Sequence, residues 1–154
     1  MDSGERVVPS GMTQVQPGKR VRQLAYAGLL PFLIGAALIW IVRADAQSHA
    51  AAALSAYAAV ILSFLGGIHW GFGIRSGNGG PANFGWAVVP SLVAWVAVLM
   101  PPNAALVIHG LMLVVCYLVD RKVYPRQAAA AWLTLRFRLT VVASLSCFLA
   151  AAAA

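Results

Sequence analysis

The sequence predicts an all-α membrane protein: a polytopic bundle of about five transmembrane helices, with a cytoplasmic N-terminus and the C-terminus outside. Of its 154 residues, 61% are hydrophobic and only 10% are charged, whereas soluble domains are about half apolar and about a quarter charged. So few charges cannot cover a soluble fold of this size, and an apolar surface has to face lipid. The apolar runs are continuous rather than alternating, which favours helices over a β-barrel.

The N-terminal segment, residues 1–22, is polar and contains glycines and prolines without an apolar period. This composition predicts a disordered tail that ends in a basic cluster, and the helix bundle is expected over residues 23–154. The cluster consists of Lys19, Arg20 and Arg22.

The first predicted span covers residues 24–42 and contains no charge. At about 1.5 Å per residue it just crosses a hydrocarbon core of about 30 Å. A cleaved signal peptide is the alternative, because Ala44-Asp45-Ala46 resembles a cleavage site. The apolar stretch is longer than the usual core of a signal peptide and contains Pro31, so an uncleaved helix is favoured.

Four further apolar runs follow the first span. A glycine-rich loop ends the second run, and Pro101-Pro102-Asn103 imposes a tight turn after the third. Residues 120–136 are expected to form a basic loop or interfacial segment, and the last span rests on hydropathy alone. The four runs predict spans at residues 49–74, 84–100, 104–119 and 137–154.

The basic residues indicate the orientation in the membrane. With five spans, every Lys and Arg except Arg43 falls on the side of the N-terminus. Short cytoplasmic loops carry an excess of Lys and Arg, so this asymmetry predicts an N-terminus in the cytoplasm or matrix. The net charge of +7 is then explained by topology, and no nucleic-acid binding is expected.

The second predicted span carries the string Ser-Phe-Leu-Gly-Gly-Ile-His-Trp-Gly at residues 63–71. Its G-x-x-x-G pattern allows close helix approach in membranes. Its histidine is ionisable inside the membrane, which makes it a functional candidate by default. The candidate functional or packing residues are Ser63, Gly66, Gly67, His69, Trp70 and Gly71.

Small residues recur along one face of the same span at helical spacing. Two interpretations stay open: this smooth stripe packs inside the bundle, which we favour, or it forms a homodimer. The stripe consists of Ala52, Ala56, Ala59, Ser63 and Gly67.

Two prolines inside predicted spans are expected to kink their helices. Pro31 frees the carbonyl of Ala27, and Pro90 frees that of Trp86. Both lie at a depth comparable to that of His69, where the bundle can admit water, a proton or a headgroup. The simpler interpretation, which we favour, is that His69 donates a hydrogen bond to a freed carbonyl.

A charged cluster is predicted at the inner face. Asp120 closes the fourth span, and an ion pair with Arg136 or Arg138 would clamp the fourth and fifth helices together. A basic pocket for an anionic lipid headgroup is the alternative, and the two can coexist. The basic residues of this cluster are Arg121, Lys122, Arg126, Arg136 and Arg138.

No catalytic residue, metal site or cofactor is predicted. Phosphate-binding, zinc-protease and hydrolase motifs are absent in any plausible context. Cys116 and Cys147 each lie alone in an apolar run, which does not indicate a metal site. His69 and His109 lie near opposite membrane surfaces and cannot ligate one haem iron, and His49 lies at or beyond a helix end.

The string Gly66-Gly67-Ile68-His69-Trp70-Gly71 resembles the hallmark of the transmembrane protein 69 family. Further pieces of the resemblance lie around Pro31, Pro90, Asp120 and Arg136, within roughly residues 24–145. Where the family pattern has a proline before Thr140, this chain has Leu139, so the start of the fifth helix is expected to differ. The resemblance implies a multi-pass protein of the bacterial or mitochondrial inner membrane, without an established activity.

Three functions are consistent with these features. A non-enzymatic accessory or assembly factor of a membrane complex is favoured by the small size, the smooth helix face and the one-sided basic surface. A small transporter or channel, with His69 as a gating or proton-handling residue, is the alternative. A lipid- or quinone-handling membrane enzyme is the third.

Overall fold

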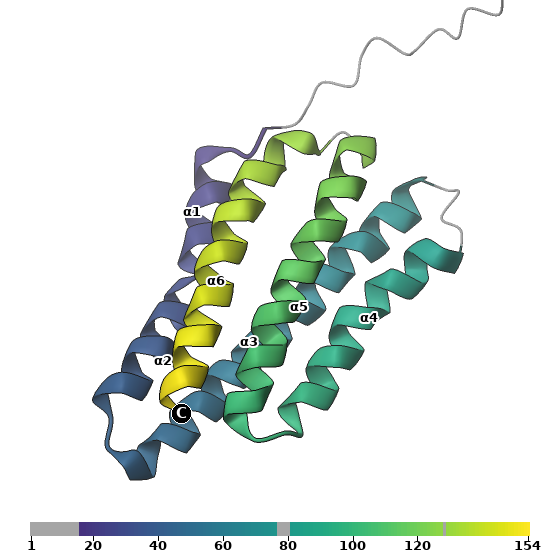
Figure 1. Cartoon of the computed structure of the whole chain (residues 1–154). Helices are drawn as coiled ribbons and strands as arrows, with labels where there is room; N and C mark the ends of the chain where they lie inside the picture. The colour runs from purple at the N-terminus through teal and green to yellow at the C-terminus, as the bar shows by residue number, and fades with distance from the viewer. Residues whose placement is uncertain (1–15, 77–80, 128) are drawn as a thin grey trace, which may run out of the picture.

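The computed structural model describes residues 16–76, 81–127 and 129–154 (Figure 1). The described chain is helical, and successive long helices run up and down in one bundle. Its α-helices are α1 (Lys19–Ala27), α2 (Leu30–Ile41), α3 (Ala44–Ser76), α4 (Pro81–Val98), α5 (Pro102–Val123) and α6 (Leu133–Ala153), and its short 3-10 helices are η1 (Tyr124–Gln127) and η2 (Ala130–Trp132).

The described helices confirm the predicted all-α membrane bundle. Four stretches are long and apolar enough to cross a membrane, and a shorter apolar helix, Phe84–Val98, lies among them. The last predicted span, residues 137–154, which rested on hydropathy alone, is one of the four. It is long enough because α6 begins at Leu133, earlier than expected. The four stretches are Lys19–Ile41, Ala44–Arg75, Pro102–Arg126 and Ala130–Ala153.

The first span is broken into two helices rather than kinked. α1 ends at Ala27, and Pro31 lies in the first turn of α2, where a missing N–H leaves no helical acceptor unpaired. At the break, the Gly28 carbonyl accepts a hydrogen bond of 2.8 Å from the hydroxyl of Tyr57 on α3. Pro90, in contrast, lies buried inside a continuous α4.

Two predicted boundaries are wrong at the basic end of the bundle. α1 already begins at Lys19, so the basic cluster assigned to the end of the tail belongs to a helix; residues 1–15 of that tail lie outside the described residues. Of the two expectations for residues 120–136, the loop is wrong, because α5 continues to Val123 and the two short 3-10 helices follow before α6; the interfacial segment stays a prediction. The charged residues of this segment are therefore held on regular structure.

α3 lies at the centre of the bundle and packs against α2, α4 and α5. Its buried face includes Ala51, Ala58 and Leu62, which are fully enclosed. Close helix crossings depend on glycines: a side-chain carbon at Gly66 would overlap the backbone carbonyl oxygen of Ala87 on α4. This contact brings α3 and α4 together.

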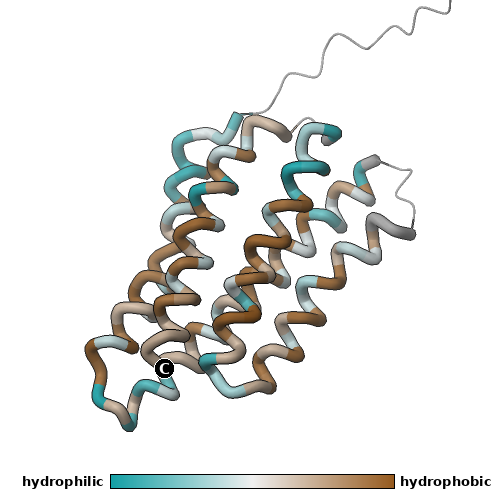
Figure 2. Tube along the Cα trace, viewed as in Figure 1, coloured by the Kyte–Doolittle hydropathy of each residue, from teal (hydrophilic) through white to brown (hydrophobic). Residues whose placement is uncertain are grey.

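Hydrophilic residues gather at one end of the bundle, where α1 begins, α5 ends and α6 begins (Figure 2). The helix ends at this pole carry basic residues, including Lys19 in α1, Arg75 in α3, and Arg121 and Lys122 in α5. We call it the basic pole. Arg43 lies between α2 and α3 at the opposite end.

Candidate functional site

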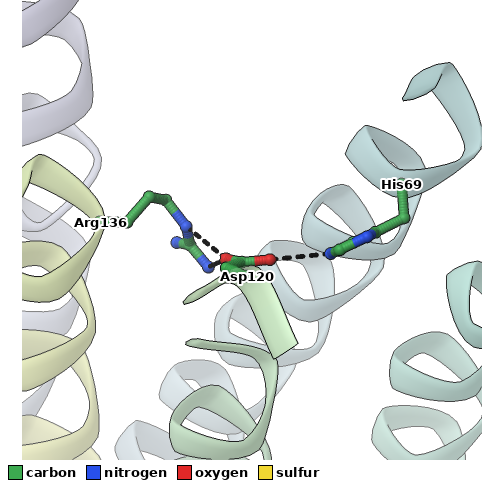
Figure 3. Close-up of polar contacts among 3 residues, drawn as sticks. All are labelled: His69, Asp120 and Arg136. Atoms are coloured by element: carbon green, nitrogen blue, oxygen red, sulfur yellow. Dashed lines mark hydrogen bonds and ion pairs between the residues drawn. The ribbon is translucent and has the colours of Figure 1, made fainter. Parts of the chain in front are cut away.

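Three polar side chains from three helices meet inside the bundle (Figure 3). His69 comes from α3, Asp120 from α5 and Arg136 from α6. Their exposed fractions are only 7%, 2% and 9%. Helices from three separate parts of the chain are thus joined by ionisable side chains that are almost fully buried.

The Asp120 carboxylate is the centre of this cluster. Its Oδ2 accepts hydrogen bonds from Nε and Nη2 of Arg136, at 2.8 and 2.6 Å. Its Oδ1 lies 2.8 Å from Nε2 of His69. Because a carboxylate only accepts, His69 carries a proton on Nε2 in this arrangement. Both carboxylate oxygens are therefore occupied by donors.

The contacts of Asp120 offset the energetic cost of burying its charge. A carboxylate or guanidinium alone in an apolar interior is strongly disfavoured, whereas a pair with good geometry and further hydrogen bonds is tolerated. Arg136 supplies the opposite charge to Asp120, and His69 supplies the additional donor. The cluster consequently ties α3, α5 and α6 together.

Aromatic rings line one side of the cluster. The Phe72 ring lies edge-on to His69, with centroids 6.1 Å apart. It is also edge-on to Tyr124 of η1, at 5.5 Å. Tyr124 is itself buried. It was not among the predicted site residues, although it lies one helical turn after Asp120: its backbone is still helical and its N–H bonds the Asp120 carbonyl, so the i, i+4 spacing could have placed it beside the cluster.

The structure assigns His69 a different partner from the one favoured above. The interpretation that His69 bonds a carbonyl freed by a proline is wrong, because its Nε2 contacts the Asp120 carboxylate. The expected ion pair between Asp120 and an arginine of the last span is present, with Arg136. The remaining basic residues of the predicted cluster are exposed and outside it: Arg121, Lys122, Arg126 and Arg138.

A second buried polar contact lies elsewhere in the bundle. His109 on α5 is fully buried; its Nδ1 is 3.3 Å from the Ser55 hydroxyl, and its Nε2 is 3.4 Å from the Ala94 carbonyl. His49 is exposed at the start of α3. Among the described residues, no group of three His, Cys, Asp or Glu side chains is placed to hold a metal ion.

The small-residue stripe of α3 faces outward. Ala52, Ala56, Ser63 and Gly67 are exposed, and only Ala59 is half-buried. Within the described part of the chain, nothing lies within 4 Å of a side-chain carbon built at Gly67 or Gly71. The interpretation that this stripe packs inside the bundle is therefore wrong, because the adjacent face of α3 points inward.

An apolar cavity of about 390 Å³ lies between α1, α2, α3 and α6, beside Arg136. Thr140 lines it one helical turn after Arg136. Its hydroxyl is buried and has no hydrogen-bond partner among the described residues. The cavity thus combines apolar walls with one polar group that is not satisfied.

The fold and the cluster define a polytopic membrane helix bundle in which a buried carboxylate joins three helices. Over residues 18–152 the chain matches the family described as "Protein of unknown function (DUF3429)", and it belongs to that family. It is 41% identical over 133 residues to Transmembrane protein 69 of Xenopus tropicalis. These matches confirm the resemblance drawn from the Gly66–Gly71 string.

The match to the Xenopus protein covers 80% of this chain and 50% of that relative. The chain therefore spans about half the length of the curated relative it matches. No solved structure matches this sequence.

Proposed function

We propose that this protein is a non-enzymatic accessory or assembly factor that binds a helix of another membrane protein on the outer face of α3. The observation that carries the proposal is that the small-residue stripe, except for the half-buried Ala59, is exposed, as is Gly71 beyond its end. In lipid, helices associate through close van der Waals contact, and small residues allow their backbones to approach. The inner membrane suggested by the family resemblance is part of this proposal.

Of the five stripe residues, only Ala59 packs against the core of the bundle. The inward face of α3 carries the core residues Leu54, Leu62 and Leu65, and the glycine contact to α4 is made by Gly66. A partner backbone could therefore pack against Gly67 and Gly71 without displacing any contact of the fold. Trp70, which is 46% exposed and lies edge-on to Phe84, borders the same surface.

The ionisable cluster supports this function more than transport. A proton or ion pathway needs a group that can exchange its partner in contact with water. In the described structure, both oxygens of Asp120 are occupied, and His69 is buried against them. Such a closed cluster is suited to holding α3 in a fixed orientation.

The experiment compares the native mass of the wild-type protein with that of the variants Gly67→Leu and Gly71→Leu. Each protein is extracted gently from its own membrane. Gly85→Leu on α4 is the matched control, because Gly85 is also exposed with nothing described within 4 Å. We expect a heavier species containing a second protein, lost in the α3 variants and kept in the control. A heavier species that survives the α3 variants contradicts the proposal, and a species made only of this chain replaces it with a homodimer.

Flux through proteoliposomes tests the transporter alternative separately. The accessory function predicts that purified protein gives no conductance or uptake above empty liposomes. Flux that is lost in folded His69→Gln protein, while the partner complex still forms, would identify a transporter.

A further inference from the structure

A basic hollow of about 560 Å³ lies where α1 passes α6 at the basic pole. Lys19 and Arg22 of α1 and Arg138 of α6 line it. All three side chains are exposed. Polar neighbours, including Gln23 and Thr134, complete the lining. Two helices that are distant in sequence thus direct three positive charges at one space.

These three charges have no carboxylate to neutralise them among the described residues. Asp45 lies at the far end of the bundle, beside Arg43. Asp120 is nearer, but its oxygens are occupied by Arg136 and His69. Three like charges around one space repel one another and attract an anion.

α1 needs support that its own packing does not supply. It has nine residues, and none of them is buried. Its contact with α6 is slight compared with the packing of α3 on α4. An anion shared by α1 and α6 would supply the missing connection.

We propose that the basic hollow binds the phosphate of an anionic phospholipid, which bridges α1 and α6. Anionic headgroups bind basic pockets between transmembrane helices at the membrane surface. The apolar cavity described above adjoins the hollow, because Leu135 lines both. A phospholipid can use both, whereas free phosphate offers only the charge. The site differs from the predicted headgroup pocket, because only Arg138 is common to both.

The first test measures lipid binding by native mass spectrometry of the purified full chain. The probes are phosphatidylglycerol, phosphatidylcholine and inorganic phosphate. The test variant combines Lys19→Gln, Arg22→Gln and Arg138→Gln. The matched control combines Arg121→Gln, Lys122→Gln and Arg126→Gln, which removes the same charge from exposed positions at the same pole, outside the hollow.

We expect phosphatidylglycerol to bind better than phosphatidylcholine and its affinity to fall by about 100-fold in the test variant, since each interfacial cation contributes about 1 kcal/mol. The affinity of the control variant for phosphatidylglycerol should fall by less than about tenfold. Equal losses in the two variants, or equal binding of the two lipids, would overturn the site.

The second test follows amide hydrogen exchange of residues 19–27 in neutral micelles. Added phosphatidylglycerol should slow exchange there, and Arg138→Gln should abolish the effect although it changes no residue of α1. Unchanged exchange in the wild-type chain would contradict the bridging role. The same protection by inorganic phosphate at equal concentration would identify a simple anion site and overturn the lipid.

Discussion

Nε and Nη2 of Arg136 both donate to one oxygen of Asp120, Oδ2, at 2.8 and 2.6 Å. The other oxygen is thereby left to His69 of α3. The division of the carboxylate between two donors from two helices makes Asp120 the residue that links α3, α5 and α6 through polar contacts.

Asp120→Asn should destabilise the protein by about 3–5 kcal/mol, because it leaves the buried guanidinium of Arg136 without a counter-charge. Unfolding by a denaturing detergent in mixed micelles measures this loss. Asp45→Asn is the control, since its exposed ion pair with Arg43 at 3.9 Å should contribute less than about 1 kcal/mol. Similar losses in the two variants would show that the buried pair does not hold the bundle.

Gly66→Ala and Gly67→Ala should differ in sign, although the two residues are neighbours. A methyl group at Gly66 collides with the Ala87 carbonyl and should destabilise the α3–α4 crossing by about 1–3 kcal/mol. At Gly67 the space is open, so the better helix propensity of alanine should stabilise the protein by up to about 1 kcal/mol. The same unfolding assay compares the stability of the two variants. A larger loss of stability in Gly67→Ala than in Gly66→Ala would mean that Gly67, not Gly66, faces the inside of the bundle.

Thr140→Val should leave the stability unchanged or raise it by up to about 1 kcal/mol, since it removes a buried hydroxyl without a described partner and keeps the shape. Ser144→Ala is the contrasting change on the same helix. It deletes a hydrogen bond of 2.7 Å to the Thr140 carbonyl and should cost about 1 kcal/mol. A clear loss in Thr140→Val would mean that the hydroxyl is bonded in the membrane.

Cysteine labelling tests the predicted orientation. Arg126 and Asn103 are exposed at opposite ends of α5 and its following turn, whereas the native Cys116 and Cys147 are buried. An impermeant thiol reagent should reach Arg126→Cys from the cytoplasmic side and Asn103→Cys from the opposite side. If the reagent labels both cysteines from the same side, the predicted topology is wrong. If it reaches Arg126→Cys from outside and Asn103→Cys from the cytoplasm, the predicted orientation is reversed.

Local composition was sufficient to predict the spans and their order. An apolar run of span length, a glycine-rich or proline-rich turn and a basic flank are each properties of neighbouring residues. The exceptions are the break of the first span between α1 and α2 and the basic pole, where charged residues continue α1 and α5 beyond their apolar runs. An ion pair between Asp120 and an arginine of the last span was also predictable, because a carboxylate and an arginine at adjoining span ends have few other partners in lipid. The choice of Arg136 over Arg138 was not.

Tertiary structure alone decided which face of α3 points inward and which group meets His69. In a membrane bundle, residues facing protein and residues facing lipid are both apolar, so the alternation that orients a soluble helix is missing. Gly66 and Gly67 are identical in sequence terms, yet one contacts Ala87 and the other faces outward. His69 and Asp120 are separated by 51 positions, and they meet because the turns and close crossings of the bundle bring α3 and α5 together.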